Sequence, residues 1–176
     1  MYTGDGMYHV VFNGYGEHRA DANPTGIFPV VYYNDCRRQF VELTGPEVGR
    51  NLDSEFVQDV FAHYPGNAIG NAYPTIAGGP DGEIVALWQQ IEVDSDGQVV
   101  LADDQYGQES NYYATDIYGA LSLDHGLNWS EPFYITGSPR VSDIYPVLAD
   151  GLQADEDNVY INFIYFIDGD PGTSVF

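Results

Sequence analysis

The chain has 176 residues, 44% of them hydrophobic, so it is long enough for one folded domain with a buried core and is not an intrinsically disordered segment. Its 27 acidic residues face only five basic ones, all arginine, and the resulting net charge of −22 argues against nucleic acid or anionic lipid as a partner. No run of 18 apolar residues is present, which argues against membrane insertion, and the single cysteine, Cys36, excludes a disulfide within the chain.

A repeat runs through the chain with a step of 76 residues, which separates Asp5 from Asp81 and Asp81 from Asp157. Asp5–Phe12, Asp81–Trp88 and Asp157–Ile164 each begin with Asp-Gly or Asp-Asn and continue as a β-branched and aromatic run. This pattern predicts a hairpin turn that enters a buried strand. A second repeat precedes two of these copies and predicts a short strand leading into the turn: Tyr73–Ala77 and Tyr145–Ala149.

Two further strands, Gly26–Tyr33 and Asp116–Ser122, are also predicted to correspond. Each is followed by an aspartate and, five residues later, by an aromatic side chain: Asp35 and Phe40 after the first strand, Asp124 and Trp129 after the second. The successive elements are then a Tyr-Pro strand, an Asp-Gly turn, a long strand, a loop, a third strand, a second turn and a final strand. That order predicts a four-stranded antiparallel unit.

The second turn has the pattern Ser-x-Asp-x-Gly-x-Asn-Trp, formed by Ser122, Asp124, Gly126, Asn128 and Trp129. A carboxylate can accept backbone N–H bonds across a tight turn, glycine permits positive φ, and an indole packs well between sheets. The pattern resembles the Asp-box of sialidases and related BNR-repeat β-propellers, including secreted bacterial repeat proteins. This resemblance implies a structural role for the five residues, away from the face that holds the active site in the family.

The resemblance implies an all-β chain built as a β-propeller of four-stranded antiparallel blades. One partial propeller domain would span 1–176, with the last three strands of a blade in 1–48, a connection in 49–72, a complete Asp-box blade in 73–136 and the start of the next blade in 137–176. The helical spacing of apolar residues in Ser54–His63 predicts a short helix there, with an inter-blade loop as the alternative. Two to three blades cannot close a ring of typically 4–8, so further blades of the same polypeptide or other chains are expected as partners.

Acidic residues gather in the loop after the long strand of the complete blade. Asp94, Asp96, Asp103 and Asp104 offer oxygen ligands of the kind that Ca²⁺ prefers. The loop lacks the rest of an EF-hand, notably the Glu at its twelfth position, and the favoured interpretation is a solvated polar turn. Ca²⁺ is therefore the one cofactor that the sequence suggests, and this loop is its first candidate site.

Tyr112 and Tyr113 lie in or beside the same loop, where aromatic rings would stack on a sugar; packing between blades is the alternative. The Phe/Tyr-Arg-Ile-Pro motif that carries one substrate-binding arginine in sialidases is absent. The sequence therefore favours a non-catalytic extracellular module that binds protein or glycan, or builds a surface assembly. A glycoside hydrolase completed by missing blades and a calcium-stabilised structural repeat are the alternatives.

A secreted or cell-surface location is implied by the family resemblance. No signal peptide is visible in Met1–Gly6, which is consistent with its removal or with a chain that begins inside a larger protein.

Overall fold

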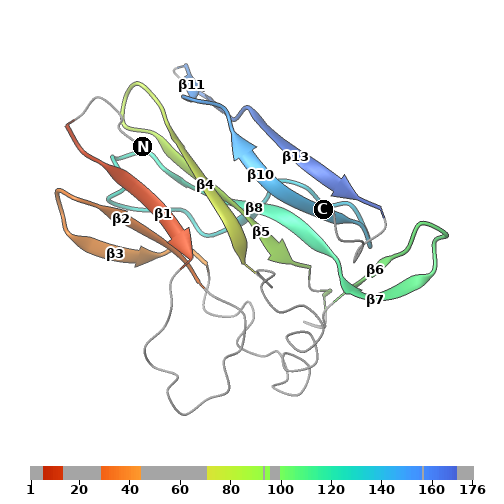
Figure 1. The fold of residues 1–176 in the computed structure, drawn as a ribbon. Helices are drawn as coiled ribbons and strands as arrows, with labels where there is room; N and C mark the ends of the chain where they lie inside the picture. The colour runs from red at the N-terminus through yellow and green to blue at the C-terminus, as the bar shows by residue number, and fades with distance from the viewer. Residues whose placement is uncertain are drawn as a thin grey trace, which may run out of the picture.

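The computed structural model describes residues 6–13, 29–44, 71–92, 94–95, 100–155 and 157–169. Within these ranges every regular element is a β-strand and every strand pair is antiparallel, so the predicted all-β class is confirmed (Figure 1). In the same part of the chain, no helix is long and apolar enough to cross a membrane. The predicted helix at Ser54–His63 lies outside the described residues.

The central sheet has four strands in the order β4 (Ala72–Gly78), β5 (Ile84–Ile91), β8 (Thr115–Ser122) and β9 (Phe133–Tyr134). The middle pair is continuous over eight residues, from Ile84 opposite Ser122 to Ile91 opposite Thr115. Every residue of β5 is buried. A strand covered on both faces needs apolar side chains on both, and the unbroken run from Ile84 to Trp88 supplies them.

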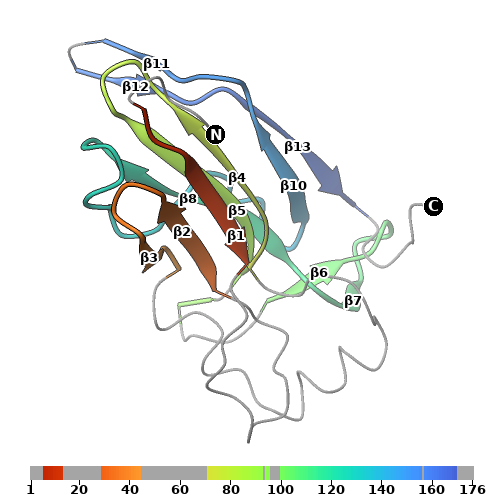
Figure 2. The same cartoon turned by 60° about the vertical axis from the view of Figure 1, so that its left-hand side comes forward.

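Two smaller sheets flank the central one. One contains β1 (His9–Asn13), β2 (Val30–Asn34) and β3 (Gln39–Glu42), and the other pairs β10 (Ser142–Leu148) with β13 (Phe163–Asp168). Two separate hairpins are formed by β6 (Leu101–Asp103) with β7 (Glu109–Tyr113) and by β11 (Gln153–Ala154) with β12 (Val159–Tyr160). The three sheets lie side by side with the central sheet between the other two (Figures 1 and 2).

Each face of the central sheet contributes to a separate hydrophobic cluster. On one face, Trp88 and Tyr118 pack against Tyr32 of the first sheet. On the opposite face, Leu87 packs in the cluster that contains Leu148 of the third sheet. Because β5 alternates its side chains between the two faces, consecutive residues of one strand serve both clusters.

The structure differs from the 76-residue repeat at its third copy, where the prediction of one buried strand is wrong. Val159 and Tyr160 belong to the β11–β12 hairpin, and β13 begins only at Phe163. The interruption has a local cause, because the Asp155 carboxylate accepts the backbone N–H groups of Asp157 and Asn158 and closes a tight turn.

That turn also changes which residues correspond between the sheets. In the central sheet Thr75 lies opposite Leu87, and in the third sheet Val147 lies opposite Ile164. Thr75 and Val147 occupy the same position of the Tyr-Pro repeat. The spacing between equivalent residues on β5 and β13 is therefore one residue longer than the sequence repeat indicates.

Candidate functional site

Three acidic residues lie at one end of the central and third sheets. Glu92 directly follows β5, Asp116 is the second residue of β8, and Asp143 is the second residue of β10. Strand pairing places Gln90 opposite Asp116, and the Thr115 hydroxyl donates a 3.1 Å hydrogen bond to the Asp143 carbonyl. Segments up to 51 positions apart in the sequence thus converge at this strand end.

In this acidic cluster of Glu92, Asp116 and Asp143, the two aspartates are buried and Glu92 is half-buried. The exposed fraction is 1% for Asp116 and 0% for Asp143. Within the described residues, both carboxylate oxygens of Asp143 and one of Glu92 are buried without a hydrogen-bond partner. Burial raises the pKa of Asp116 to about 6, with a further contribution from the charges of Glu92 and Asp143. Burial also raises the pKa of Glu92.

The loop between β9 and β10 closes over this cluster through its backbone. The Ser138 amide donates to the Asp116 carboxylate, and the Arg140 amide donates to the Glu92 carboxylate. Both hydrogen bonds favour the charged carboxylates and so partly oppose the effect of burial. Within the described part of the chain, the two aspartates of the cluster are therefore closed off from solvent.

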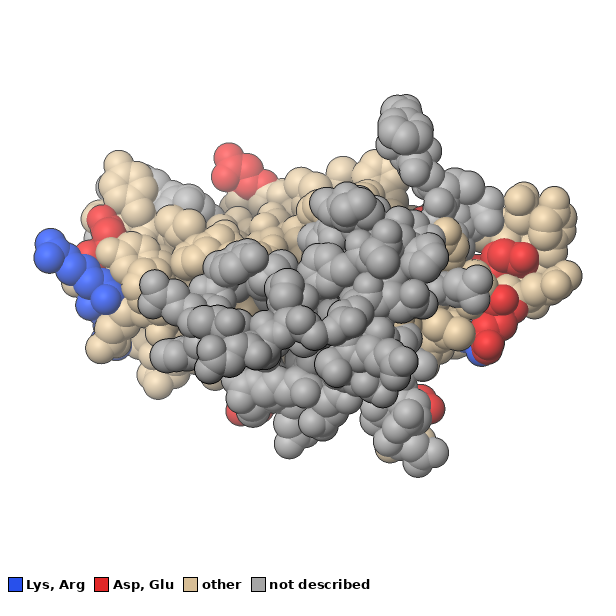
Figure 3. Space-filling view, turned by 60° about the horizontal axis from the view of Figure 1, so that its bottom comes forward, with Lys and Arg blue, Asp and Glu red and all other residues tan. Residues whose placement is uncertain are grey.

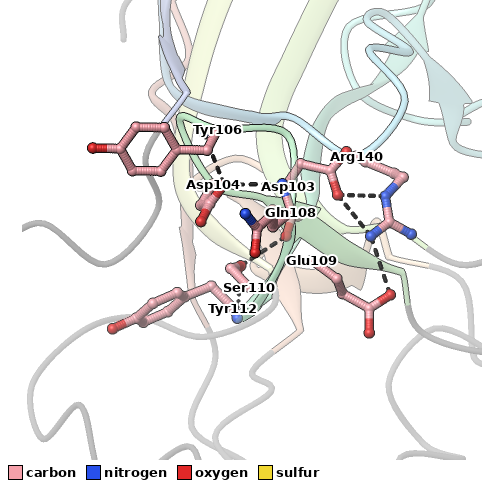
Figure 4. Close-up of polar contacts among 9 residues, drawn as sticks. Asp103, Asp104, Tyr106, Gln108, Glu109, Ser110, Tyr112 and Arg140 are labelled. Atoms are coloured by element: carbon pink, nitrogen blue, oxygen red, sulfur yellow. Dashed lines mark hydrogen bonds and ion pairs between the residues drawn. The ribbon is translucent and has the colours of Figure 1, made fainter.

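The guanidinium of Arg140 forms ion pairs with the β6–β7 hairpin, and its positive charge also acts to lower the pKa of Glu92. The guanidinium lies 2.7 Å from Asp103 and 3.1 Å from Glu109, and the Asp103 amide donates a 2.7 Å hydrogen bond to the Arg140 carbonyl (Figure 4). Together these contacts fix the hairpin to the start of the third sheet.

The structure describes three of the four predicted calcium ligands, Asp94, Asp103 and Asp104. Asp103 is paired with Arg140, and one oxygen of Asp104 accepts the amides of Tyr106 and Gln108 in the hairpin turn. Asp94 lies in the short described segment 94–95, whereas Asp96 lies outside the described residues. No three acidic, histidine or cysteine side chains in the described part of the chain form a group suited to a metal ion, and the Ca²⁺ site stays a prediction.

The predicted aromatic pair lies on β7 of the same hairpin. Tyr112 and Tyr113 are both half-buried, and the Tyr112 amide donates to the Ser110 hydroxyl. Tyr106 in the hairpin turn is 77% exposed. The rings of Tyr106 and Tyr112 extend away from Arg140 (Figure 4). The sequence reasoning missed Tyr106, although Asp104 and Gly107 around it have the composition of a tight turn.

The 122–129 turn lies at the other end of β8. The Asp124 carboxylate accepts bonds from the amides of Leu127 and Asn128 and from the Asn128 side chain. These bonds, those from Asn128 foremost, lower the pKa of Asp124 to about 2. The Ser122 hydroxyl donates to Asp124 and accepts the Gly126 amide. All of these contacts are internal to the turn, and the structural role of its residues stays a prediction.

The acidic cluster was also missed by the sequence reasoning. A signal for part of it exists, because the tripeptide Asp-Ile-Tyr occurs at 116–118 and again at 143–145, each time at the start of a strand. Elsewhere the acidic side chains are dispersed. Figure 3 shows those of the described residues in several separate small groups on one face, as expected for a solvated surface.

Comparisons of the chain with known protein families, with curated proteins and with solved structures found no match.

Proposed function

We propose that this chain is part of an Asp-box β-propeller that works outside the cell as a non-catalytic module for binding protein or glycan. The supporting observation is the difference between two equivalent positions. Leu87 on the central sheet is 0% exposed under the third sheet, whereas Ile164 on the third sheet is 68% exposed. When an apolar position is buried in one repeat and exposed in the next, the exposed copy is expected to be the place where another sheet packs.

Other side chains of the third sheet support the same proposal. Tyr145 and Val147 on β10, and Phe166 on β13, are exposed as well. The partners in this proposal are further sheets, supplied by the same polypeptide or by other chains, that continue the stack toward a ring.

Binding is favoured over catalysis by the closure of the acidic cluster. A carboxyl group with a raised pKa near 6 is a typical general acid, and this makes a glycoside hydrolase the second candidate function. Asp116 is nevertheless buried and held by the Ser138 amide, so a substrate would have to displace the β9–β10 loop to reach it. Of the described arginines, Arg140 is paired with acidic residues and Arg37 and Arg38 lie in the β2–β3 turn.

The β6–β7 hairpin is the proposed ligand-contacting element. It presents Tyr106 and Tyr112 on a backbone that Arg140 holds in place, and aromatic rings fixed in this way bind sugars or peptides with little loss of side-chain entropy.

The test combines binding and turnover assays on the purified chain. Binding to an array of glycans and extracellular proteins should fall by at least about tenfold in Tyr106→Ala with Tyr112→Ala, whereas Tyr134→Ala, an exposed tyrosine on β9, should leave binding unchanged. Turnover of sialosides or β-glycosides that Asp116→Asn abolishes would overturn the proposal and establish the hydrolase. Binding that is insensitive to the hairpin substitutions would contradict the assignment of the ligand-contacting element.

A further inference from the structure

The three stacked sheets of the chain are joined twice by the same kind of contact. Val11 of β1 packs into the cluster between the first and central sheets, and Leu87 of β5 packs into the cluster between the central and third sheets. Val11 and Leu87 occupy the same position of the 76-residue repeat. Each of these two sheets therefore uses this position to meet the sheet that follows it.

The next residue of the same repeat meets the sheet on the other side. Consecutive side chains of a strand point to opposite faces, and Trp88 accordingly packs with Tyr32 of the preceding sheet. Tyr165 follows Ile164, the equivalent of Leu87, and packs in the cluster that the third sheet shares with the central sheet. Both internal contacts thus join one kind of face to the opposite kind of face on the next sheet.

The third sheet has one face that no other sheet of the described residues covers. Register places Val147 opposite Ile164 and Ile144 opposite Phe166, so these four side chains form one face, the outer face of the third sheet. Val147, Ile164 and Phe166 are exposed. In the central sheet, the equivalent face is covered by the sheet that follows.

The first sheet leaves the opposite kind of face uncovered. Phe12 occupies the repeat position of Trp88, and Val10 and Phe40 both lie opposite Tyr33. The Phe40 ring centroid lies 6.2 Å from that of Phe12 and 5.0 Å from that of Tyr33. Phe40 is 68% exposed, and Val10 is exposed as well. Val10, Phe12, Tyr33 and Phe40 form the outer face of the first sheet.

We propose that the outer face of the third sheet binds the outer face of the first sheet of a second copy of this chain. The proposal rests on the stacked-sheet function proposed above and names its partner. The two faces are of opposite kinds, as in both internal contacts, and both are apolar. The acidic side chains that alternation adds to these faces, Glu42 and Asp168, are the last residues of β3 and β13 and lie at the rim.

This contact is heterologous, because different faces of the two copies meet. Each copy keeps one face free for a further contact of the same kind, so the contact repeats until a ring closes. Two copies of three stacked sheets bring together six sheets, within the range of 4–8 blades in closed propellers. An isologous contact, in which two third-sheet faces meet, would not use the first sheet at all.

The test uses one substitution on each face, separately and mixed. Sedimentation of the full chain at about 1 M salt, where the Debye length is about 3 Å, should show association of the wild type at concentrations up to about 100 μM. Ile164→Ser and Phe40→Ser should each raise the Kd of association by at least about tenfold. An equimolar mixture of the two variants should associate again, because the intact first-sheet face of one variant meets the intact third-sheet face of the other.

Leu123→Ser is the matched control. Leu123 is an exposed apolar residue of the 122–129 turn and belongs to neither outer face, so its substitution should leave association unchanged. If circular dichroism shows that a face variant does not fold, Val147→Ser or Val10→Ser replaces it on the same face.

Three outcomes would overturn the proposal: a wild type that stays monomeric, a mixture of the two variants that does not associate, and association that Phe40→Ser leaves unchanged. The last would mean that third-sheet faces meet each other. Ligand binding is measured separately on the same samples. A wild type that binds ligand but stays monomeric would overturn the pairing of faces alone, and a wild type that associates without binding any ligand would overturn the binding function alone.

Discussion

The indole ring of Trp129 packs edge-on against the phenol ring of Tyr32, with centroids 4.8 Å apart and ring planes at 62°. The contact joins the 122–129 turn of the central sheet to the first sheet. The Tyr32 hydroxyl is in turn held by two hydrogen bonds, one of 2.6 Å with Nδ1 of His9 and one of 3.2 Å that the Asn34 side-chain nitrogen donates to it. Among the described residues, the turn has one long-range backbone bond, from the His125 amide to the Gly82 carbonyl of its own sheet, and one buried aromatic ring attaches it to the neighbouring sheet.

Gly126 is the first position at which this arrangement can be tested. Its φ of +77° disfavours a side chain, and a Cβ there would overlap the Tyr32 phenol, whereas Gly107 has a φ of +72° with nothing within 4 Å. Gly126→Ala should therefore lower the free energy of unfolding by about 3 kcal/mol or more, and Gly107→Ala by only about 1 kcal/mol. Urea denaturation of the two variants checks this, and equal losses would show that the overlap with Tyr32 is relieved at no cost.

Asp124 should make the turn sensitive to acid. Its folded pKa of about 2 lies below the value of about 3.9 for an unfolded aspartate, so its contribution is present above pH 4 and is lost as the pH falls toward 2. Asp124→Asn keeps an acceptor but does not titrate. The wild type should be more stable than Asp124→Asn by about 1 kcal/mol at pH 6, and the difference should shrink between pH 4 and pH 2. Urea denaturation at a series of pH values measures this difference in stability. A difference that stayed constant from pH 6 to pH 2 would contradict the prediction.

The 122–129 turn and the central sheet were predictable because their determinants are local. Ser122, Asp124 and Gly126 bond one another within a few residues, and the apolar run of β5 shows directly that both of its faces are covered. The acidic cluster was not predictable, because its members come together only through the register of β5 with β8 and the start of β10. The interruption of the third repeat was not predictable either. There, the short turn at Asp155 outweighs the strand propensity of the residues after it.

Asp116 should show the opposite pH dependence from Asp124. Its folded pKa of about 6 lies above the unfolded value of about 3.9, so the folded chain holds a proton that the unfolded chain has lost. Stability should therefore fall as the pH rises from 4 through 6. Asp116→Asn removes this effect and should be more stable than wild type by about 1–2 kcal/mol at pH 8, with little difference at pH 4.

Thermal melting at both pH values checks this, with exposed Glu131→Gln as a control that stays within about 0.5 kcal/mol of wild type. If Asp116→Asn were less stable than wild type at pH 8, the folded protein would stabilise the charged Asp116 carboxylate, contrary to this prediction.

Leu87 and Ile164 occupy equivalent positions and allow a matched test of the stacked-sheet proposal. Leu87→Ala removes a side chain packed under the third sheet and should cost about 2–5 kcal/mol, because a buried cavity remains. Ile164→Ser acts on an exposed face and should change the free energy of unfolding of the chain alone by no more than about 0.5 kcal/mol.

The effect of Ile164→Ser on association should be larger. The exposed face is apolar and the chain carries a charge of −22, so added salt should screen repulsion and increase self-association of the wild type. Sedimentation at low and high salt should show this increase in the wild type and a clear reduction in Ile164→Ser. If the wild type stays monomeric at high salt, or if Ile164→Ser destabilises the chain as much as Leu87→Ala, the third sheet ends the stack and the face does not receive another sheet.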